Sequence, residues 1–364
     1  MVGDFMPCYH PLLRVWSPSA GDWKIRPFPK DLRPGFDEAV YLKNTQDGYF
    51  GCSADFPGAV PYMTVPCGKC VGCRMEYSRQ WANRCMLELE YHDSAYFVTL
   101  TYDQYHVPIS FYADPETGEA HPSMTLCPRD VTLFLKRLRK MFSNDRIRYF
   151  YCGEYGPSSW RPHYHLILFG LHLDDLVYKG TRRGNNFFTS ASLERCWSKT
   201  GVIRSLDGTE ESVTPLAPIG FVEVGEVNWQ TCAYTARYIM KKLKGSEAKF
   251  YETFALEPPF VRMSRMPGLA RQWYDDHPGM RETDFINIST PSGGKKFRPP
   301  RYFDRIYDAQ EPEASALMKQ ARQRMCIESI KAKLQRTDLS YLDYLSVEED
   351  KFKRRIKSLQ REEL

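Results

Sequence analysis

The chain has 364 residues, of which 42% are hydrophobic, enough to form the core of one large domain or two small ones. Its net charge of +5 permits a nucleic-acid partner but, on a chain of this length, does not argue for one. No run approaches the roughly 20 apolar residues of a membrane helix, and the N-terminus lacks a secretory signal pattern, so we expect a soluble cytoplasmic protein with no membrane partner.

The sequence changes character near residue 66. Residues 1–66 are rich in Pro, Gly and aromatic side chains and show few helical patterns. Residues 74–91 are predicted to form a helix, because apolar side chains recur there at every fourth position. Residues 95–102 have the composition of a strand, and residues 104–128 are expected to form a Pro-containing loop.

Cysteine usage points to a metal site. The chain has 11 Cys residues and no export signal, which indicates a reducing compartment where clustered cysteines are metal ligands more often than disulfides. Cys67, Cys70 and Cys73 follow Cys-x-x-Cys-x-x-Cys spacing, with glycines that allow tight turns. A structural Zn²⁺ binds four such ligands, so this spacing predicts a zinc site that lacks only its fourth ligand.

The fourth ligand must come from elsewhere in the N-terminal segment. Our choice is Cys8, and Cys52 and His10 are the alternatives. An iron–sulfur cluster uses similar cysteine runs, and a set of unligated reduced cysteines is the remaining interpretation. Zinc is favoured over a cluster because nothing else in the sequence suggests electron transfer.

The middle of the chain alternates predicted strands and helices. Asp130 is expected to cap a helix that runs to about residue 142. Further strands are predicted at 146–152, 163–169 and 219–226, a helix at 230–243, and charged helical sequence from 311 onward. This order is typical of an antiparallel or mixed sheet covered by helices.

Two histidines lie close together on one of these strands. Side chains on a strand alternate between faces, so His163 and His165 point the same way and can grip one metal ion. Glu154 follows the preceding strand, and its carboxylate reaches the same place if the two strands pair as a hairpin. Two imidazoles and one carboxylate with open positions suit Mn²⁺ or Mg²⁺ holding a phosphate oxygen; two ordinary hydrogen-bonded histidines are the alternative.

Two tyrosines follow in the predicted helix at 230–243. At 100° per residue, Tyr234, Tyr238 and Lys241 fall within one narrow wedge opposite an apolar face. A tyrosyl oxygen can attack a phosphodiester and form a covalent phosphotyrosine, once its ordinary pKa of roughly 10 is offset by a nearby Lys or a metal-polarised phosphate. Tyrosines at this spacing also pack in ordinary amphipathic helices, so the tyrosines and the histidines are informative only together.

In this order the two motifs resemble those of the HUH endonuclease family. More narrowly, the chain is similar to the replication initiators of microviruses, the small icosahedral single-stranded DNA phages, and above all of their gokushovirus branch. The resemblance extends over roughly residues 8–304 and is carried by Val65–Cys73 with Trp81–Arg84, Phe97–Asp103, Tyr151–Gly156 with Arg161–His165, Tyr234–Lys242 and Met263–Gly268.

The resemblance implies an α+β fold with an HUH core, which is a ferredoxin- or RRM-like antiparallel sheet covered by helices. A Cys-rich N-terminal extension and a helical C-terminal appendage would flank this core. The resemblance also implies site residues: His163, His165 and Glu154 for Mn²⁺ or Mg²⁺, Tyr238 and Tyr234 as the two nucleophiles, and Lys241 beside them.

The implied function is the initiation of rolling-circle replication. The protein would nick single-stranded phage origin DNA, form a 5′-phosphotyrosine, leave a 3′-OH primer and later rejoin the strand. Its partners would be the origin DNA and the host replication machinery, including a helicase and a polymerase, in the cytoplasm of a bacterial host. No Gly-x-x-x-x-Gly-Lys-Ser/Thr sequence is present, so we expect no nucleotide cofactor.

Basic residues near these motifs are candidates for DNA contact. Lys242 and Lys244 adjoin the tyrosine helix, where a phosphate backbone must lie. Lys296, Arg298 and Arg301 lie in a segment expected to be flexible, whose mixture of basic and aromatic residues suits a single strand.

We therefore predict four segments along the chain: a Cys-rich N-terminal segment and helix at 1–93, a nicking core at 94–245, a DNA-contacting extension at 246–310 and a charged helical region at 311–364. The alternative functions are a plasmid relaxase or transposase of the HUH class, a non-catalytic zinc-containing DNA-binding protein, and a metallohydrolase built on the two histidines.

Overall fold

The structure is a computed structural model that describes residues 8–17, 21–37, 39–42, 50–51, 59–114, 116–182, 184–204, 210–237, 248–282, 285–290 and 293–360. Contacts divide the chain into two compact units. The larger is Ser78–Pro300, and the smaller combines Met1–Tyr77 with Arg301–Leu364. The functional boundaries predicted near residues 93, 245 and 310 stay a prediction.

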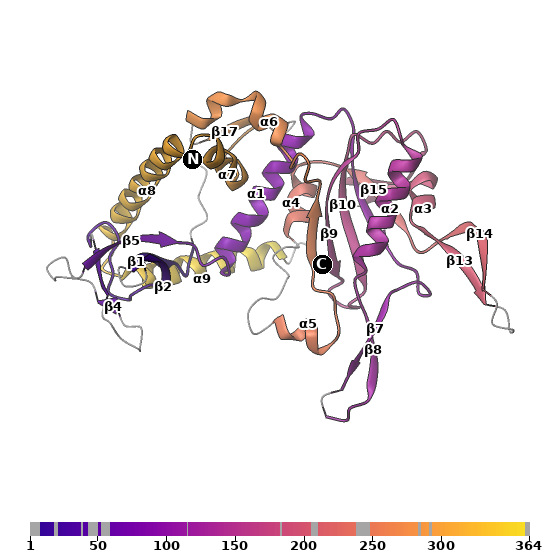
Figure 1. Ribbon diagram of the computed structural model, residues 1–364, viewed down its shortest axis with the longest axis horizontal. Helices are drawn as coiled ribbons and strands as arrows, with labels where there is room; N and C mark the ends of the chain where they lie inside the picture. Colours follow the sequence, from indigo (N-terminus) through magenta and orange to yellow (C-terminus); the bar gives the residue numbers. More distant parts are fainter. Residues whose placement is uncertain are drawn as a thin grey trace. The chain divides into compact units, whose positions relative to one another are not determined.

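The larger unit is built on a seven-stranded antiparallel sheet with the order β11-β12-β15-β6-β10-β9-β16 (Figure 1). Its strands are β6 (Ala95–Thr101), β9 (Arg148–Tyr155), β10 (Pro162–Phe169), β11 (Leu176–Arg182), β12 (Asn185–Ser190), β15 (Val222–Glu226) and β16 (Phe260–Met263). The strands predicted at 95–102, 146–152, 163–169 and 219–226 are confirmed, and so is the α+β class.

Helices of this unit differ widely in length. They are α1 (Val71–Leu89, which begins in the smaller unit), α2 (Pro128–Met141), α3 (Ala191–Cys196), α4 (Trp229–Arg237), α5 (Lys249–Thr253), α6 (Arg271–Asp276) and a 3-10 helix at Pro278–Glu282. The predicted helix at 74–91 is confirmed as α1, which begins three residues earlier. The predicted helix at 230–243 is confirmed up to Arg237, and its remainder lies outside the described residues.

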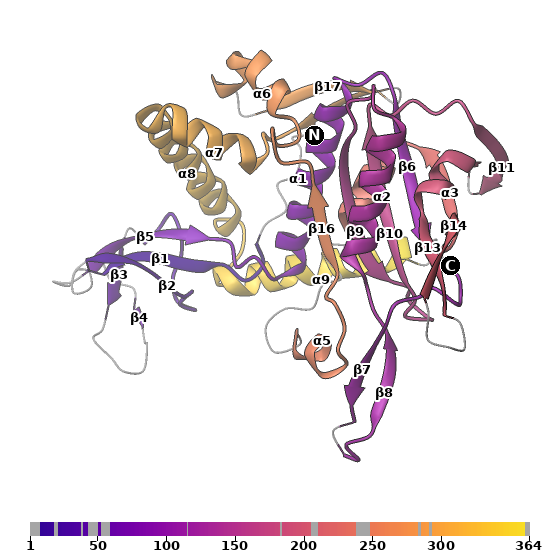
Figure 2. The ribbon, with the colours of Figure 1, turned by 45° about the vertical axis from the view of Figure 1, so that its right-hand side comes forward.

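Alternation along β10 gives the two faces of the sheet different helical covers, and Figure 2 shows α2 running along β9 and β10. Tyr164 and Leu166 are fully buried in a core to which α2 and α3 contribute. Ile167 is buried in a second core, with α4 and the last turns of α1. Since His163 and His165 share the parity of Ile167, both face the α4 side, as the strand pattern predicted.

The segment at 104–128 is not the loop that we expected. It contains a hairpin of β7 (Ile109–Ala113) and β8 (Ala120–Met124), which projects from the sheet in Figure 1. Ser110 and Ser123 join the strands through their hydroxyls, 2.9 Å apart. The prediction was wrong because short strands with polar side chains and a proline lack an apolar alternation. Two further hairpins are β13 (Ser198–Arg204) with β14 (Glu210–Pro218), and β17 (Ile286–Thr290) with β18 (Gly293–Phe297).

Asp130 does not cap α2 as predicted. The helix begins at Pro128 with Cys127 at the N-cap, and Asp130 lies in the first turn. Its carboxylate is buried, accepts a hydrogen bond from the Tyr102 hydroxyl at 2.8 Å and pairs with Lys199 at 3.1 Å. A carboxylate in the first turn still favours the helix through its dipole, so the residue stabilises α2 by another route.

The smaller unit combines the two ends of the chain. Its sheet has the order β2-β1-β5-β3-β4, and its strands and helices are β1 (Leu12–Ser17), β2 (Asp22–Pro27), β3 (Ala39–Leu42), β4 (Phe50–Gly51), β5 (Ala59–Val65), α7 (Arg301–Gln310), α8 (Pro312–Leu334) and α9 (Tyr341–Gln360). Leu13 and Val15 of β1 pack in one core with Leu334, Tyr341 and Leu345. The C-terminal helices are therefore not the appendage that we predicted, because they complete the core of the N-terminal strands. None of the helices in the described ranges is long and apolar enough to cross a membrane.

Candidate active site

Three predicted ligands meet on the α4 side of the large sheet. The register of β9 and β10 places Glu154 directly opposite His163. The Glu154 Oε1 atom lies 2.8 Å from His163 Nε2 and 3.3 Å from His165 Nε2. Glu154 is 2% exposed and His165 is 6% exposed, so the carboxylate is nearly withdrawn from water and needs a cationic partner.

This arrangement fits a divalent metal ion. The ligand atoms of Glu154, His163 and His165 all lie within 4.8 Å of one another. In an octahedral site with bonds of about 2.1 Å, neighbouring ligand atoms lie about 3 Å apart, close to the two distances measured here. Three protein ligands leave positions in such a site for water or a phosphate oxygen, as the sequence predicted.

Two further contacts orient the imidazoles, and neither was predicted. His165 Nδ1 lies 3.0 Å from the Thr99 hydroxyl of β6, and His163 Nδ1 lies 3.2 Å from the Arg161 carbonyl oxygen. With each Nδ1–H donating to these oxygens, both Nε2 lone pairs face Glu154, which is how metal-binding histidines are commonly held. The only signal for Thr99 was its place on a predicted strand, because nothing local showed that this strand pairs with β10.

Tyr234 stands beside the candidate ligands. Its ring centroid lies 5.2 Å from that of His165 at an interplanar angle of 74°, and 6.1 Å from that of Phe97. Cys232 and Ala236 of the same helix are fully buried in the core, whereas Tyr234 is 37% exposed. The apolar face of α4 thus packs against the sheet and presents this phenol at the metal side.

A local hydrogen-bond pair fixes where α4 begins. The Thr231 backbone N–H donates to Asn228 Oδ1, and the Asn228 backbone N–H donates to Thr231 Oγ1, each at 2.9 Å. This reciprocal pattern is a capping box, with Asn at the N-cap and Thr three residues later. The register of α4, and with it the direction of Tyr234, therefore follows from the sequence around the helix start.

Other tyrosines near the site are unsuited to nucleophilic attack. Burial raises the pKa of Tyr155 and Tyr164, and it raises the pKa of Tyr151 to about 12. The Tyr155 hydroxyl donates to the Glu257 carbonyl at 2.8 Å, a structural role. Among these tyrosines and Tyr234, only Tyr234 exposes more than a third of its surface.

The remaining predicted residues are more scattered. Tyr238, Lys241, Lys242 and Lys244 lie outside the described residues. Lys296 lies in β18 with its ammonium 4.2 Å from the Phe285 ring centroid, Arg298 follows the strand, and Arg301 begins α7 in the smaller unit. The expectation of a flexible segment here is wrong for 293–297, because these residues pair with β17.

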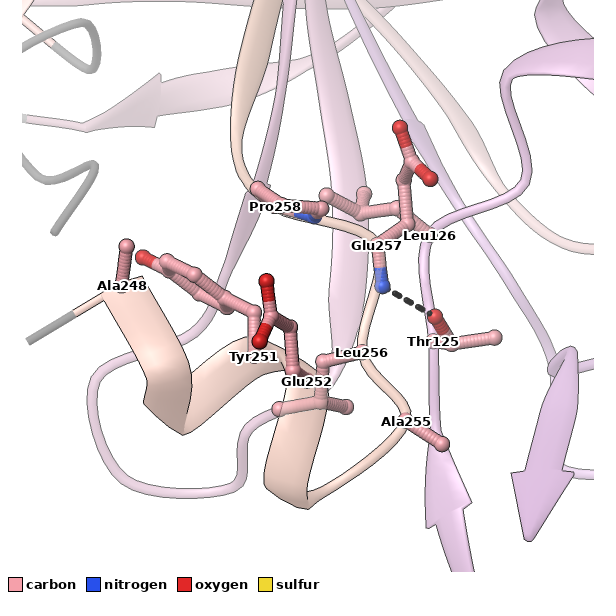
Figure 3. A pocket seen from close by; sticks show the side chains of 9 residues that line it. All are labelled: Thr125, Leu126, Ala248, Tyr251, Glu252, Ala255, Leu256, Glu257 and Pro258. Carbon is pink, nitrogen blue, oxygen red and sulfur yellow. Dashed lines mark hydrogen bonds between the residues drawn. The ribbon is translucent and has the colours of Figure 1, made fainter. Parts of the chain in front are cut away.

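A separate open pocket of about 520 Å³ lies against the end of β8 (Figure 3). Its lining comes from Thr125, Leu126, Ala248, Tyr251, Glu252, Ala255, Leu256, Glu257 and Pro258. The Glu257 backbone N–H donates to the Thr125 hydroxyl at 2.9 Å, which joins the two sides of the pocket. The two glutamates make this an unfavourable place for phosphate, so we do not assign DNA backbone binding to it.

Comparison with known proteins agrees with the site. Residues 95–243, which include all the predicted ligands and tyrosines, match the family described as Replication-associated protein ORF2. The chain is 32% identical over 305 residues to Replication-associated protein ORF2 of Spiroplasma virus 4, covering 82% of this chain and 85% of that protein. It is 26% identical over 257 residues to Replication-associated protein VP4 of Bdellovibrio phage phiMH2K, covering 68% and 69%.

A third relative, Replication-associated protein ORF4 of Chlamydia phage 1, is 26% identical over 187 residues, covering 49% of this chain and 38% of that protein. No solved structure matches the chain.

Proposed function

The chain belongs to the microvirus-type family of phage replication-associated proteins, and from this premise we propose that it initiates rolling-circle replication by cutting and rejoining single-stranded origin DNA with a tyrosine nucleophile. The observation that carries the proposal is the position of Tyr234, edge-on to His165 in a cluster of candidate metal ligands. An HUH-type endonuclease requires this juxtaposition of phenol, imidazoles and carboxylate.

We assign a Mn²⁺ or Mg²⁺ ion to Glu154, His163 and His165. Such an ion, when bound, supplies positive charge that stabilises the scissile phosphate in the transition state. The chain itself holds the ligands in place, because the Thr99 hydroxyl and the Arg161 carbonyl fix both imidazoles with their Nε2 atoms toward Glu154.

Tyr234 is the nucleophile that the described geometry supports. Its phenolic oxygen forms a bond to the phosphorus as the bond from phosphorus to the 3′ oxygen breaks. The phenol proton passes to solvent, and the departing 3′ oxygen takes up a proton to become the 3′-OH primer. The phosphoryl bond is conserved in the phosphotyrosine, so a 3′-OH can later attack it and rejoin the strand without a nucleotide cofactor.

The second tyrosine extends this chemistry to a full round of replication. Tyr238 follows Tyr234 by four residues, the spacing that predicts a shared helix face. One tyrosine opens the origin, and the other cuts the regenerated origin while the first phosphotyrosine is resolved into a circle. Lys241, Lys242, Lys244, Lys296, Arg298 and Arg301 are assigned to the phosphates, and a host helicase and polymerase to strand separation and synthesis.

The competing functions explain less of the site. A non-catalytic zinc-containing DNA-binding protein has no use for Tyr234 against His165. A metallohydrolase uses the three ligands but gives the tyrosine no role. A relaxase or transposase shares the chemistry, but the matched family and the names of the relatives favour phage replication.

A covalent-adduct assay tests the proposal. Purified protein would be incubated with Mn²⁺ and labelled single-stranded DNA that spans a candidate origin, and the products separated under denaturing conditions. The variants are Tyr234→Phe, Tyr238→Phe, the double variant and His163→Ala. Tyr105→Phe is the matched control, because that side chain is 82% exposed on a loop.

We expect a protease-sensitive, metal-dependent DNA adduct in the wild-type protein and in Tyr105→Phe. His163→Ala and the double tyrosine variant should lose it by at least a hundredfold, the usual cost of removing a nucleophile or its electrostatic support. Each single tyrosine variant should fail to release closed circles. Cleavage without any adduct, or an adduct that persists in the double variant, would overturn the proposal.

A further inference from the structure

Four cysteines of the smaller unit converge on one point, and none of them is used in the proposed chemistry. The sulfur atoms of Cys8, Cys67, Cys70 and Cys73 all lie within 4.8 Å of one another. The Cys67 and Cys73 sulfurs are 4.0 Å apart, and those of Cys8 and Cys70 are 3.9 Å apart. A disulfide would require about 2.05 Å, so these are four separate thiols.

The measured spacing matches tetrahedral zinc. Bonds of about 2.3 Å from Zn²⁺ to four thiolates place neighbouring sulfurs about 3.8 Å apart. The two sulfur–sulfur distances above differ from this value by only a few tenths of an ångström. A chance cluster of packed cysteines has no reason to adopt that separation.

Backbone N–H groups surround the sulfurs. Their donor-to-sulfur distances run from 3.2 to 3.5 Å, and the pairs are Tyr9 to Cys70, Cys67 to Cys8, Lys69 to Cys67, Cys70 to Cys67 and Cys73 to Cys70. Four thiolates on Zn²⁺ leave two negative charges, which directed N–H dipoles stabilise. Neutral thiols are weak acceptors and gain little from such an array.

The local chain conformation is built for this convergence. Gly68 has φ of +72°, a left-handed conformation that glycine adopts without strain, and it turns the chain between Cys67 and Cys70. Cys73 lies in the first turn of α1, which gives that ligand a rigid support. His10 is not the fourth ligand, since its Nε2 pairs with Glu349 at 3.0 Å, and Cys52 lies outside the described residues.

We propose that Cys8, Cys67, Cys70 and Cys73 bind one structural Zn²⁺ that fastens the N-terminal segment to the start of α1 and to α9. Four protein ligands close the coordination sphere, so the ion takes no part in DNA cleavage. Next to Cys8, the ring of Tyr9 is buried and lies 6.1 Å from that of Phe352 in α9, and Cys70 and Phe352 belong to the same small core. Occupancy of the site therefore controls how the C-terminal helix packs.

Metal analysis of the full-length protein tests the proposal independently of DNA cleavage. The protein would be purified without chelators, and its zinc and iron measured per chain by mass spectrometry. His163→Ala is included so that zinc at the histidine site is not counted. Cys8→Ser and Cys70→Ser remove ligands, and Cys326→Ser is the matched control because this exposed cysteine of α8 belongs to the same unit.

We expect about one zinc per chain in the wild type, His163→Ala and Cys326→Ser, and a loss of at least tenfold in Cys8→Ser and Cys70→Ser. Replacement by Co²⁺ should give the visible absorption of a tetrahedral thiolate site, a readout that does not depend on a ligand variant folding. Iron in place of zinc, zinc retained in both ligand variants, or Co²⁺ without thiolate absorption would each overturn the proposal.

Discussion

Replacing Thr99 by Val removes one contact of the candidate metal centre and changes little else. The Thr99 hydroxyl lies 3.0 Å from His165 Nδ1 and fixes the ring whose Nε2 faces Glu154. Valine has nearly the same shape, so the variant loses a hydrogen bond worth about 1 kcal/mol and the orientation it imposes. Such outer contacts typically contribute 10- to 100-fold to metal affinity, and we expect the Kd for Mn²⁺ to rise about tenfold.

The assay is calorimetric titration of Mn²⁺ into the purified protein, followed by nicking rates at saturating Mn²⁺. Thr101→Val is the matched control. Thr101 lies two residues along β6 and opposite His163, but its hydroxyl donates to the Phe221 carbonyl at 3.4 Å. Since saturating metal compensates for weaker binding, we expect the nicking rate of Thr99→Val to recover to within a few-fold of the wild type.

Two results would refute this reasoning. One is a Thr99→Val protein that binds Mn²⁺ within twofold of the wild type, which would mean that the hydroxyl does not orient the ligand. The other is an equal loss of affinity in Thr101→Val, which would mean that any change in β6 weakens the site.

Two further predictions concern stability. Burial alone would raise the pKa of Glu88, but hydrogen bonds from His92, the Ala270 backbone N–H and Arg148 lower it below its ordinary value of 4.5. Its contribution is therefore complete above that value and lost as the pH falls through the folded pKa; in urea unfolding, Glu88→Gln should cost about 2 kcal/mol at neutral pH and much less in acid, and a pH-independent difference would contradict this. A Cβ atom on Gly220 would lie 1.9 Å from the Thr101 carbonyl oxygen, so Gly220→Ala should destabilise by about 3 kcal/mol in the same assay, whereas Gly279→Ala, with nothing within 4 Å, should change stability little.

The sequence predicted features that depend on local periodicity. The strand pattern placed His163 and His165 on one face, and the hairpin of β9 and β10 then brought Glu154 to them, as the structure confirms. The i, i+4 pattern likewise predicted α1 and the start of α4. These predictions hold because period-2 and period-3.6 patterns reflect which side of an element is buried.

Features that depend on pairing between distant segments were not predicted. The packing of Leu13 with Leu345 joins residues from opposite ends of the chain, and no local pattern in either segment specifies its partner. The contact of Thr99 with His165 is of the same kind, because it exists only through the pairing of β6 with β10. The capping box at Asn228 was readable, but it decides only where α4 starts, not which sheet face it covers.

The two candidate metal sites differ in ligand chemistry in a way that keeps their ions apart. Four thiolates are soft ligands that select Zn²⁺ and have little affinity for Mn²⁺ or Mg²⁺. Two imidazoles and a carboxylate leave open positions and accept the harder ions that bind phosphate oxygens. A protein stripped by a strong chelator should therefore need Zn²⁺ to regain the packing of its smaller unit and Mn²⁺ or Mg²⁺ to cut DNA. Because Cys8 and His163 belong to different units, a variant of either should abolish one requirement and leave the other unchanged.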